Sequence, residues 1–511
     1  MHPRLHARTQ PDKAAIVMAE TGETVSYGEL EARANQGAHL FRSLGLVRGD
    51  VIALFLENHP RYLEICWAAQ RAGLYFTCIS TALTAGEVDY ILRDCAARLF
   101  VTSRAKAPVV ETLAPKLGGA YLFTVDAGHG PFAPFEAARA TMPETPISDP
   151  APGRDMLYSS GTTGRPKGVK AALIDEPFDA DIPLAALSRA LYGFNEQTVY
   201  LSPAPLYHAA PLRFCMSAHR AGATVVVMEK FEPEFALRLI ETHRVTASQW
   251  VPTHFIRMLK LPEDVRRKYD LSSLRCAIHA AAPCPIETKR EMIAWWGPIL
   301  KEYYGGTEGN GLTVIASEDW LAKPGSVGKA VLGQLKICDE QGEEVAPGVD
   351  GAVYFAGGPE FAYHNDPEKT AQSRNKRGWT TLGDIGHVDA DGYLFLTDRK
   401  AFMIISGGVN IYPQELENLL VTHPKVGDAA VIGAPDPEMG EKVVAVVQPM
   451  DWGEAGPILR DELMAYARDN ISHVKAPKQI DFLRELPRSA TGKLYKRLLR
   501  DSYWGKTSRV V

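Results

Sequence analysis

The run YSSGTTGRPKGV, Tyr158–Val169, combines hydroxyl side chains, glycines and one lysine. Glycines let backbone N–H groups converge on phosphate oxygens, hydroxyls add hydrogen-bond donors, and Lys167 supplies a positive charge. This composition predicts a loop that binds a polyphosphate. It is not a Walker A loop, because Pro166 stands where that motif has glycine and Gly168 follows the lysine. Taken alone, the same residues could also form a solvated turn.

Two later segments carry side chains suited to a nucleotide. EYYGGTEG holds Tyr304, an aromatic ring that can stack on a base, and Glu308, a carboxylate of the kind that Mg²⁺ prefers beside phosphate oxygens. GWTTLGDIG holds Asp384, whose two oxygens can chelate the vicinal hydroxyls of a ribose. Each has a simpler explanation when judged alone: a core aromatic, a helix-capping glutamate and a turn aspartate.

Together these segments resemble the motifs of the adenylate-forming superfamily. That superfamily includes acyl- and aryl-CoA synthetases, peptide-synthetase adenylation domains and beetle luciferases. The phosphate loop is similar to the family pattern nearly residue for residue. The remaining similar segments follow in the family's order: EYYGGTEG, GSVGK, GWTTLGDIG, LTDRK, ISGGVNIYPQELE and LPRSATGKLYKR. The glycine loop IISGGVNIYPQE is close to the acyl-CoA synthetase form.

The resemblance implies a role for each matching residue. Lys493 would be catalytic, bridging the substrate carboxylate and the α-phosphate, with Thr307 near that phosphate, Glu308 on Mg²⁺ and His208 at the gate of the acyl pocket. The resemblance further implies residues that contact ATP, and two glycines, Gly407 and Gly408, that form a tunnel for the incoming thiol. The full set is Ser159, Ser160, Gly161, Thr162, Thr163, Gly164, Lys167, Ala280, Ala281, Ala282, Tyr303, Tyr304, Gly305, Gly306, Asp384, Arg399, Gly407 and Gly408.

The implied activity is that of an acid–CoA ligase. The substrate carboxylate would attack the α-phosphate of ATP in line and expel pyrophosphate, and coenzyme A would then take the acyl group, leaving AMP. The protein need supply mainly positioning and charge neutralisation. Five residues are expected to form the acyl pocket: His208, Trp250, Val251, Ala280 and Gly305. The small residues at 280–282 and 305–306 suggest a roomy apolar cavity, and hence a fatty, aryl or polycyclic acid.

Other functions stay open at this point. Within the superfamily, the enzyme could load a carrier-protein thiol or release acyl-AMP, or act as a luciferase-like oxygenase. A non-catalytic nucleotide-binding module is disfavoured because Lys493, Glu308 and the phosphate loop are intact. Lys475, Lys478 and the cations of the C-terminal tail could hold coenzyme A phosphates, although a charge run is usually a solvated face.

Hydrophobic spacing predicts an α/β fold. Helices are expected at 27–44, 60–72 and 233–243 and strands at 50–56, 74–80, 98–103, 223–231 and 274–283. A β-rich layer is expected from Lys336. A proline-initiated helix at 413, strands at 428–436 and 442–449 and a helix at 460–469 would follow. We therefore expect a large N-terminal domain of αβ-layered sheets with a β-rich subdomain, residues 1–398, and a small mobile α+β C-terminal domain, residues 399–511, carrying Lys493.

Composition narrows the function further. The net charge of −5 does not favour a nucleic-acid surface. The 7 cysteines are scattered without a CxxC pair, so a disulfide framework or structural zinc site is not expected. No stretch has the length of a transmembrane segment or the pattern of a signal peptide, which favours a cytoplasmic enzyme. The resemblance also allows a homodimer.

Two segments depart from the family pattern. Ala401 stands at the position of the family's hinge, which is commonly Asp or Lys, and Phe402 follows where a polar residue is usual. This puts the timing of domain rotation in question, although small residues can serve as hinges. The acidic segment LIDEPFDADIP, Leu173–Pro183, follows the phosphate loop and is expected to be a surface loop near the site entrance, where it could help select substrates.

Overall fold

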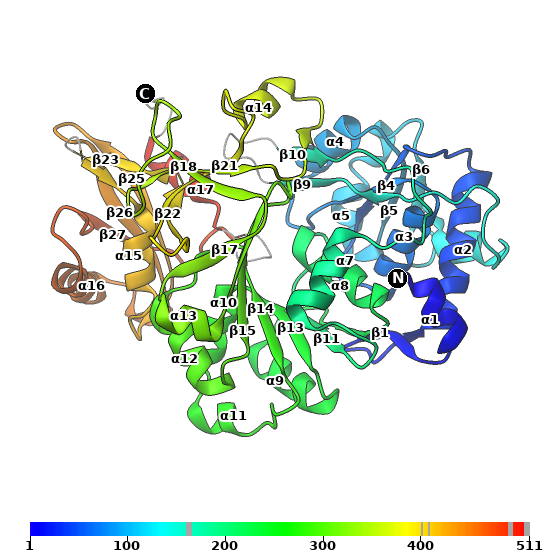
Figure 1. The fold of residues 1–511 in the computed structure, drawn as a ribbon, viewed down its shortest axis with the longest axis horizontal. Helices are drawn as coiled ribbons and strands as arrows, with labels where there is room; N and C mark the ends of the chain where they lie inside the picture. Colours follow the sequence, from blue (N-terminus) through cyan, green and yellow to red (C-terminus); the bar gives the residue numbers. More distant parts are fainter. Residues whose placement is uncertain (160–165, 400–401, 407–408, 489–493, 505–511) are drawn as a thin grey trace. The chain divides into compact units, whose positions relative to one another are not determined.

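The computed structural model describes residues 1–159, 166–399, 402–406, 409–488 and 494–504. Predicted site residues 160–164, 407, 408 and 493, and the hinge position 401, lie outside the described residues. The chain forms two compact units (Figure 1). The first comprises Met1–Trp250, Lys260–Ile278 and Glu360–Thr370, and the second comprises Val251–Leu259, His279–Pro359 and Ala371–Val511. The expected boundary at residue 398 stays a prediction.

The first unit contains a parallel six-stranded sheet in the order β7-β6-β5-β3-β4-β8. Its strands are β3 (Val51–Phe55), β4 (Tyr75–Cys78), β5 (Ala97–Thr102), β6 (Tyr121–Thr124), β7 (Ala133–Pro134) and β8 (Arg154–Asp155). The helices before and between them include α2 (Tyr27–Ser43), α3 (Pro60–Arg71) and α4 (Ala85–Asp94). Every residue of β3 is buried, as expected for a central parallel strand. The predicted helices and strands of this region are confirmed. Thr84 and Glu87 form a capping box at the start of α4.

A second sheet of the first unit runs in the order β14-β13-β11-β12-β1-β2. It comprises β1 (Ala14–Met18), β2 (Thr24–Ser26), β11 (Val199–Ser202), β12 (Thr224–Val227), β13 (Ala247–Trp250) and β14 (Cys276–His279). Helices α8 (Ala209–Arg220) and α9 (Pro233–Thr242) lie along the chain between these strands. A small antiparallel sheet, β9 (Leu157–Ser159), β10 (Lys167–Lys170) and β20 (Ala362–Tyr363), carries both ends of the predicted phosphate loop.

The acidic segment 173–183 is a loop, as predicted, and leads into α7 (Pro183–Tyr192). Its middle is anchored, however, because the side chain of Phe178 is buried and its ring meets that of His2 at 5.2 Å. Gln70 Nε2 donates a hydrogen bond of 2.7 Å to the Phe178 carbonyl. The loop is therefore fixed to the N-terminal helix α1 (Pro3–Thr9) and to α3.

The second unit begins with an antiparallel sheet in the order β18-β19-β21-β22-β17-β16-β15. Its strands are β15 (Leu300–Tyr304), β16 (Leu312–Ala316), β17 (Ser326–Leu332), β18 (Gln334–Cys338), β19 (Gly351–Ala356), β21 (Thr380–Val388) and β22 (Leu394–Arg399). Helices α10 (Pro252–Leu259), α12 (Ile286–Trp296) and α13 (Ser317–Ala322) belong to the same unit. The predicted change to a β-rich layer is confirmed.

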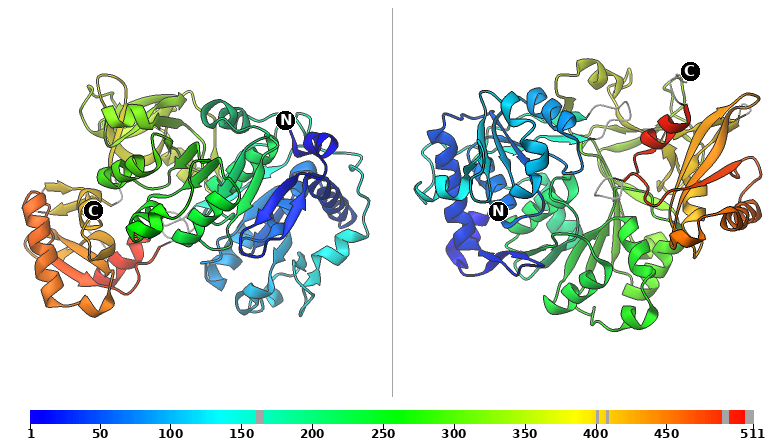
Figure 2. Two further views of the ribbon diagram at one scale, coloured as in Figure 1. Left: turned by 90° about the horizontal axis from the view of Figure 1, so that it is seen from below. Right: turned by 180° about the vertical axis from the view of Figure 1, so that it is seen from behind.

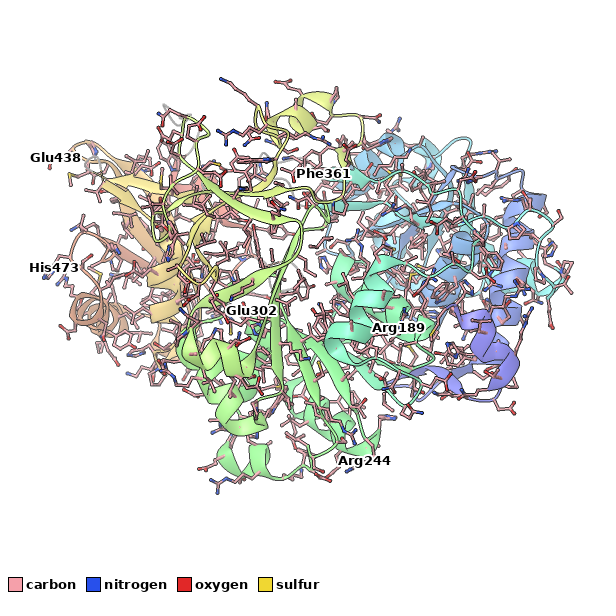
Figure 3. The ribbon with its side chains drawn as sticks, in the orientation of Figure 1. Arg189, Arg244, Glu302, Phe361, Glu438 and His473 are labelled. Carbon is pink, nitrogen blue, oxygen red and sulfur yellow. The ribbon has the colours of Figure 1, made fainter. Side chains whose placement is uncertain are left out.

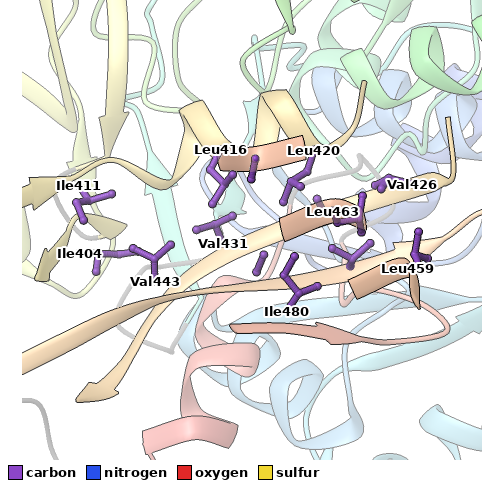
Figure 4. Packing of buried hydrophobic residues seen from close by; sticks show 14 residues of the cluster. Ile404, Ile411, Leu416, Leu420, Val426, Val431, Val443, Leu459, Leu463 and Ile480 are labelled. Atoms are coloured by element: carbon purple, nitrogen blue, oxygen red, sulfur yellow. The ribbon is translucent and has the colours of Figure 1, made fainter. Parts of the chain in front are cut away.

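The C-terminal part, orange to red in Figures 1 and 2, is a sheet with an apolar cluster on each face. Its elements are β23 (Ile404–Ser406), β24 (Val409–Ile411), α15 (Pro413–Leu420), β25 (Val426–Asp436), β26 (Gly440–Pro449), α16 (Pro457–Asn470), β27 (Gln479–Phe482) and α17 (Lys496–Trp504). Alternate residues of β25 and β26 point to opposite faces, so one set packs with α15 and α16 (Figure 4) and the other with α17. The predicted elements of this region are confirmed.

The C-terminal cations are not simply a solvated face. Arg488 Nη2 donates a 2.6 Å hydrogen bond to Asp428, and Lys496 is buried with its ammonium 2.8 Å from Glu417. The expectation of a solvated run is therefore wrong for these two cations. Both are neutralised within the C-terminal part, and Lys496 contributes to its core.

Among the described helices, none is long and apolar enough to cross a membrane. The cysteines all carry free thiols, and only Cys284 is not fully buried.

We expect Leu463→Ala to loosen the C-terminal sheet, because Leu463 is fully buried in the cluster of Figure 4. Removing a buried leucine side chain typically costs about 2–5 kcal/mol. Hydrogen exchange of the β25 and β26 amides, followed by mass spectrometry, should show faster exchange in this variant. Leu498→Ala is the control because Leu498 is 52% exposed. Equal protection in both variants would contradict the assigned core.

Candidate active site

Tyr304 and Asp384 form the best-defined contact among the predicted nucleotide-binding residues. Tyr304 ends β15, and its hydroxyl donates a 2.7 Å hydrogen bond to Oδ2 of Asp384 on β21. The Tyr304 ring stacks on Phe355, with 6.2 Å between centroids and 25° between planes. Asp384 is only 6% exposed, so the donated bond also offsets part of the cost of burying its carboxylate. The aromatic ring and the carboxylate are thus held as one group.

Arg399 joins this group through strand register. Asp384 lies opposite Arg399 in the antiparallel pair of β21 and β22. The two residues predicted to contact the ribose are therefore brought together by backbone pairing, although they lie in separate motifs.

The segment after β15 is closely packed on itself. A Cβ atom at Gly306 would lie 2.5 Å from Oε2 of Glu308 and 2.9 Å from Leu382. At Gly305 it would lie 3.0 Å from the Gly311 carbonyl oxygen. The expectation that these glycines open a roomy cavity stays a prediction, but at Gly306 the side chains of Glu308 and Leu382 leave no room for a Cβ atom. The glycine instead lets Glu308 fold back against the loop.

The Ala280–Ala282 segment follows β14 and contains a strained residue. Ala281 has φ = +79°, in the left-handed region that an L-residue with a Cβ atom avoids. Ala280 is buried, whereas Ala281 is exposed. Backbone strain of this kind, of order 1–3 kcal/mol, is found disproportionately at functional sites. This agrees with the predicted contact to ATP, which stays a prediction.

The predicted phosphate loop leaves from one strand of a hairpin and returns on the other. Lys167 lies opposite Ser159 in the antiparallel pair of β10 and β9. The Lys167 ammonium is 5.5 Å from the centroid of the Tyr363 ring, within the range of a cation–π contact. The lysine and the first hydroxyl residue of the loop therefore start from facing positions.

The predicted acyl-pocket residues have different surroundings. His208 is the residue before α8, is partly exposed, and packs its ring 4.6 Å from that of Tyr207. Trp250 is only 1% exposed, and its indole N–H donates a 2.6 Å hydrogen bond to the Ser248 hydroxyl. Val251 is buried at the start of the second unit. Their role as pocket walls stays a prediction.

Comparison with known proteins decides the family. The model described as AMP-binding enzyme matches residues 4–361, and the model of the AMP-binding enzyme C-terminal domain matches residues 415–493. The chain belongs to the AMP-binding enzymes.

Relatives of this AMP-binding enzyme match it over nearly their full length. It is 34% identical to a feruloyl-CoA synthase from an Amycolatopsis species, over 97% of this chain and 96% of that protein. It is 33% identical to indoleacetate–CoA ligase from Aromatoleum aromaticum, over 98% of this chain and 97% of that protein. It is 30% identical to the long-chain-fatty-acid–CoA ligase FadD13 from Mycobacterium tuberculosis, again over 98% and 97%.

Solved structures agree with this family. ATP-bound MatB from Rhodopseudomonas palustris superposes with a TM-score of 0.83 at 30% identity, over 99% of this chain and 100% of that one. The resemblance to acyl-CoA synthetases and the expected fold class are thereby confirmed. The AMP-binding enzyme is an AMP-forming acid–CoA ligase.

One buried group of this AMP-binding enzyme was not found by sequence reasoning. Lys289 on α12 places its ammonium 2.6 Å from Oε2 of Glu302 on β15, and both side chains are almost inaccessible to solvent (Glu302 is labelled in Figure 3). His279 Nε2 lies 3.7 Å from the same oxygen. Burial raises the pKa of Glu302 and lowers that of His279, the latter helped by the charge of Lys289.

The position of this buried group links it to the site. Glu302 immediately precedes Tyr303 and Tyr304, and His279 immediately precedes Ala280. The ion pair therefore fixes α12 to the strand that ends at the stacking tyrosine. No sequence signal distinguished Lys289 from the exposed charges around it on the helix.

We expect Asp384→Ala to weaken ATP binding at least about tenfold, since hydrogen bonds to charged groups contribute about 1.5–3 kcal/mol. ATP should lose more affinity than 2′,3′-dideoxy-ATP, which lacks the ribose hydroxyls, so calorimetric titration should give nearly equal affinities for the two nucleotides in the variant. Tyr304→Phe, which removes only the hydroxyl of the 2.7 Å bond, should weaken ATP by up to about tenfold.

Tyr354→Phe provides the matched control for Tyr304→Phe. Tyr354 adjoins Phe355 on β19, and its side chain points to the opposite face of the strand. Affinity for ATP should be unchanged in this variant. If Asp384→Ala weakened both nucleotides equally, the assignment of Asp384 to the ribose would be wrong.

Proposed function

We propose that this ligase activates a hydrophobic carboxylic acid through an acyl-adenylate, with an aryl or arylalkyl acid as its preferred class. The observation that carries the adenylation step is the assembly of Tyr304, Asp384 and Arg399, from separate motifs, at one place on the sheet. The acid class is supported by the relatives, among which ligases of ferulate and indoleacetate reach 34% and 33% identity. The relative FadD13 supports a fatty acid as the second class to test.

We assign the chemical roles as follows. Lys493 bridges the substrate carboxylate and the α-phosphate, where negative charge accumulates as the carboxylate attacks and pyrophosphate leaves. Thr307 donates toward the α-phosphate. Lys167 and the hydroxyls of the phosphate loop hold the departing pyrophosphate. His208 borders the entering acid.

Mg²⁺ fits Glu308. The carboxylate is partly exposed and is brought against the loop by the absence of a side chain at Gly306. Mg²⁺ takes one or two carboxylates together with substrate phosphates and keeps several waters, so a single glutamate suffices. When bound, the ion would neutralise charge on the phosphates.

Coenzyme A is the thiol acceptor of an acid–CoA ligase, and its phosphates are better matched here to Lys478 than to Lys475. Lys475 is already paired with Glu415 at 2.6 Å, whereas Lys478 is exposed. Free thiols throughout the cysteines suit a reducing compartment, so we place the enzyme in the cytoplasm. We also propose that the enzyme forms a homodimer, as the resemblance allows.

A second function is favoured by one relative. The fatty acid–[acyl-carrier-protein] ligase ScoC from Streptomyces coeruleorubidus is 32% identical over 99% of this chain. A carrier-protein phosphopantetheine would then replace coenzyme A in the second step. Offering both thiols with the best acid and measuring which thioester forms distinguishes the two acceptors.

The decisive experiment is ATP–pyrophosphate exchange with separate pools of aryl, arylalkyl, fatty and polycyclic acids. We expect the aryl pool or the arylalkyl pool to support exchange. Lys493→Ala should reduce the exchange rate about 100-fold or more, because preorganised charge stabilisation contributes that much in comparable sites. Lys116→Ala is the control, because Lys116 is exposed and distant in sequence from Lys493. This variant should retain the full exchange rate.

Each other outcome has a definite meaning. Exchange that persists in Lys493→Ala would remove Lys493 from the adenylation step. Exchange with the fatty pool alone would replace the proposed acid class. Exchange with no pool, while ATP still binds, would contradict the proposal of a hydrophobic acid.

A further inference from the structure

Residues 360–370 form a strap across the base of the phosphate-loop hairpin. The chain on either side of this segment belongs to the second unit, but the segment itself belongs to the first. Its strand β20 pairs antiparallel with β10, with Val169 opposite Tyr363. The backbone N–H of His364 donates a 2.7 Å hydrogen bond to the Gly168 carbonyl. The strap thus adds a third strand beside the lysine end of the loop.

Asp94, the last residue of α4, joins the strap to the other end of the hairpin. Its carboxylate accepts a hydrogen bond from the hydroxyl of Tyr158, the residue before Ser159. Its backbone carbonyl accepts from His364 Nε2 at 3.0 Å and from Asn365 Nδ2 at 3.1 Å. One residue at a helix end therefore holds both a hairpin strand and the strap.

The Tyr158 side chain is well placed for this role. Burial and the neighbouring Cys95 and Asp94 raise its pKa well above the usual value, so the hydroxyl stays protonated and is the donor. Gly168 lies opposite Tyr158 in the hairpin, and a Cβ atom there would lie 2.9 Å from the tyrosine ring. Glycine after Lys167 is therefore required for the ring to cross the hairpin and reach Asp94.

Strap residues adopt a conformation that needs support. Asn365 has φ = +53°, in the left-handed region. Phe361, labelled in Figure 3, packs edge-on against Tyr363 with 5.4 Å between centroids. Tyr363 in turn presents its ring to the Lys167 ammonium at 5.5 Å. The strap is thus held at residues 362–365, and the Tyr363 ring contacts the lysine.

We propose that Asp94, Tyr158, Tyr363 and His364 form a clamp that positions Lys167 and the two ends of the loop for the polyphosphate of ATP. These are positioning residues, since they act through Lys167 and the hairpin backbone. The inference rests on the proposed function in that it takes the loop to bind phosphates. Holding donors in place before binding lowers the ordering cost of binding, so the clamp raises affinity for ATP without contacting it.

A merely structural role predicts a different result. If the clamp only stabilised the first unit, its loss would lower thermal stability and affect all ligands alike. A positioning role predicts a loss restricted to ligands that carry phosphates. Adenosine and ATP share the base and ribose, so comparing their affinities isolates the contribution of the loop.

The experiment uses the full chain with Tyr158→Phe, Asp94→Ala and the double variant. ATP affinity is measured by calorimetry and adenosine affinity by ligand-observed NMR titration, each beside a thermal melt. We expect each single variant to bind ATP about 3- to 10-fold more weakly while adenosine affinity is unchanged, since one hydrogen bond is lost. The double variant should lose little more ATP affinity than the more affected of the two single variants, because both changes remove the hydrogen bond between Tyr158 and Asp94.

Matched controls lie close by. Asp89→Ala removes a carboxylate on the same helix that pairs only with Arg93 in the described contacts, and Tyr121→Phe removes an exposed hydroxyl on β6. Both should bind ATP as the wild type does. His364→Gln, which keeps a side-chain N–H donor, should retain more ATP affinity than His364→Ala.

Three results would overturn the clamp. They are unchanged ATP affinity in Tyr158→Phe, equal losses for ATP and adenosine, and a purely additive double variant. Failure of the wild type in pyrophosphate exchange with every acid would count against the proposed function instead. The comparison of ATP with adenosine would still decide the clamp in that case.

Discussion

The hydrogen bond between Tyr304 and Asp384 is the contact on which the nucleotide-binding half of the site depends. It joins residues 80 positions apart in the sequence and couples the end of β15 to the middle of β21. Each partner has a second contact, because Phe355 stacks on the tyrosine and strand pairing places the aspartate opposite Arg399. The antiparallel sheet of the second unit thus converts backbone register into a geometry suited to a nucleoside.

The same design recurs at the edges of other motifs. Glu302 precedes the tyrosine pair and is bound by Lys289, while Tyr158 precedes the phosphate loop and is bound by Asp94. In each case the polar side chain at the first position of the segment is tied to a helix end or a helix face. Burying such groups is costly unless they are paired, so each pair strongly favours one arrangement of the adjoining motif.

Much of the architecture could be predicted from local patterns. The capping box at Thr84, the helix-spaced apolar residues of α2 and the fully apolar β3 each specify their element within a few residues. The candidate nucleotide residues were found by motif order. By contrast, nothing local marks β20, whose Ala362 and Tyr363 pair with a strand nearly two hundred positions earlier. The close surroundings of Gly306 could not be predicted either, because they depend on Leu382, which only the tertiary structure brings near.

The surroundings of Lys496 in the C-terminal part likewise could not be predicted from the sequence. In the sequence it is one cation in a basic run, yet its ammonium lies 2.8 Å from Glu417 and 5.1 Å from the Phe402 ring. Glu417 also accepts a 2.6 Å hydrogen bond from the Val431 N–H. The chain just after residue 401 and the chain just after residue 493 therefore meet at one buried charge. Phe402, where the family usually has a polar residue, is thereby explained: it supplies the apolar and π contact that a buried ammonium needs.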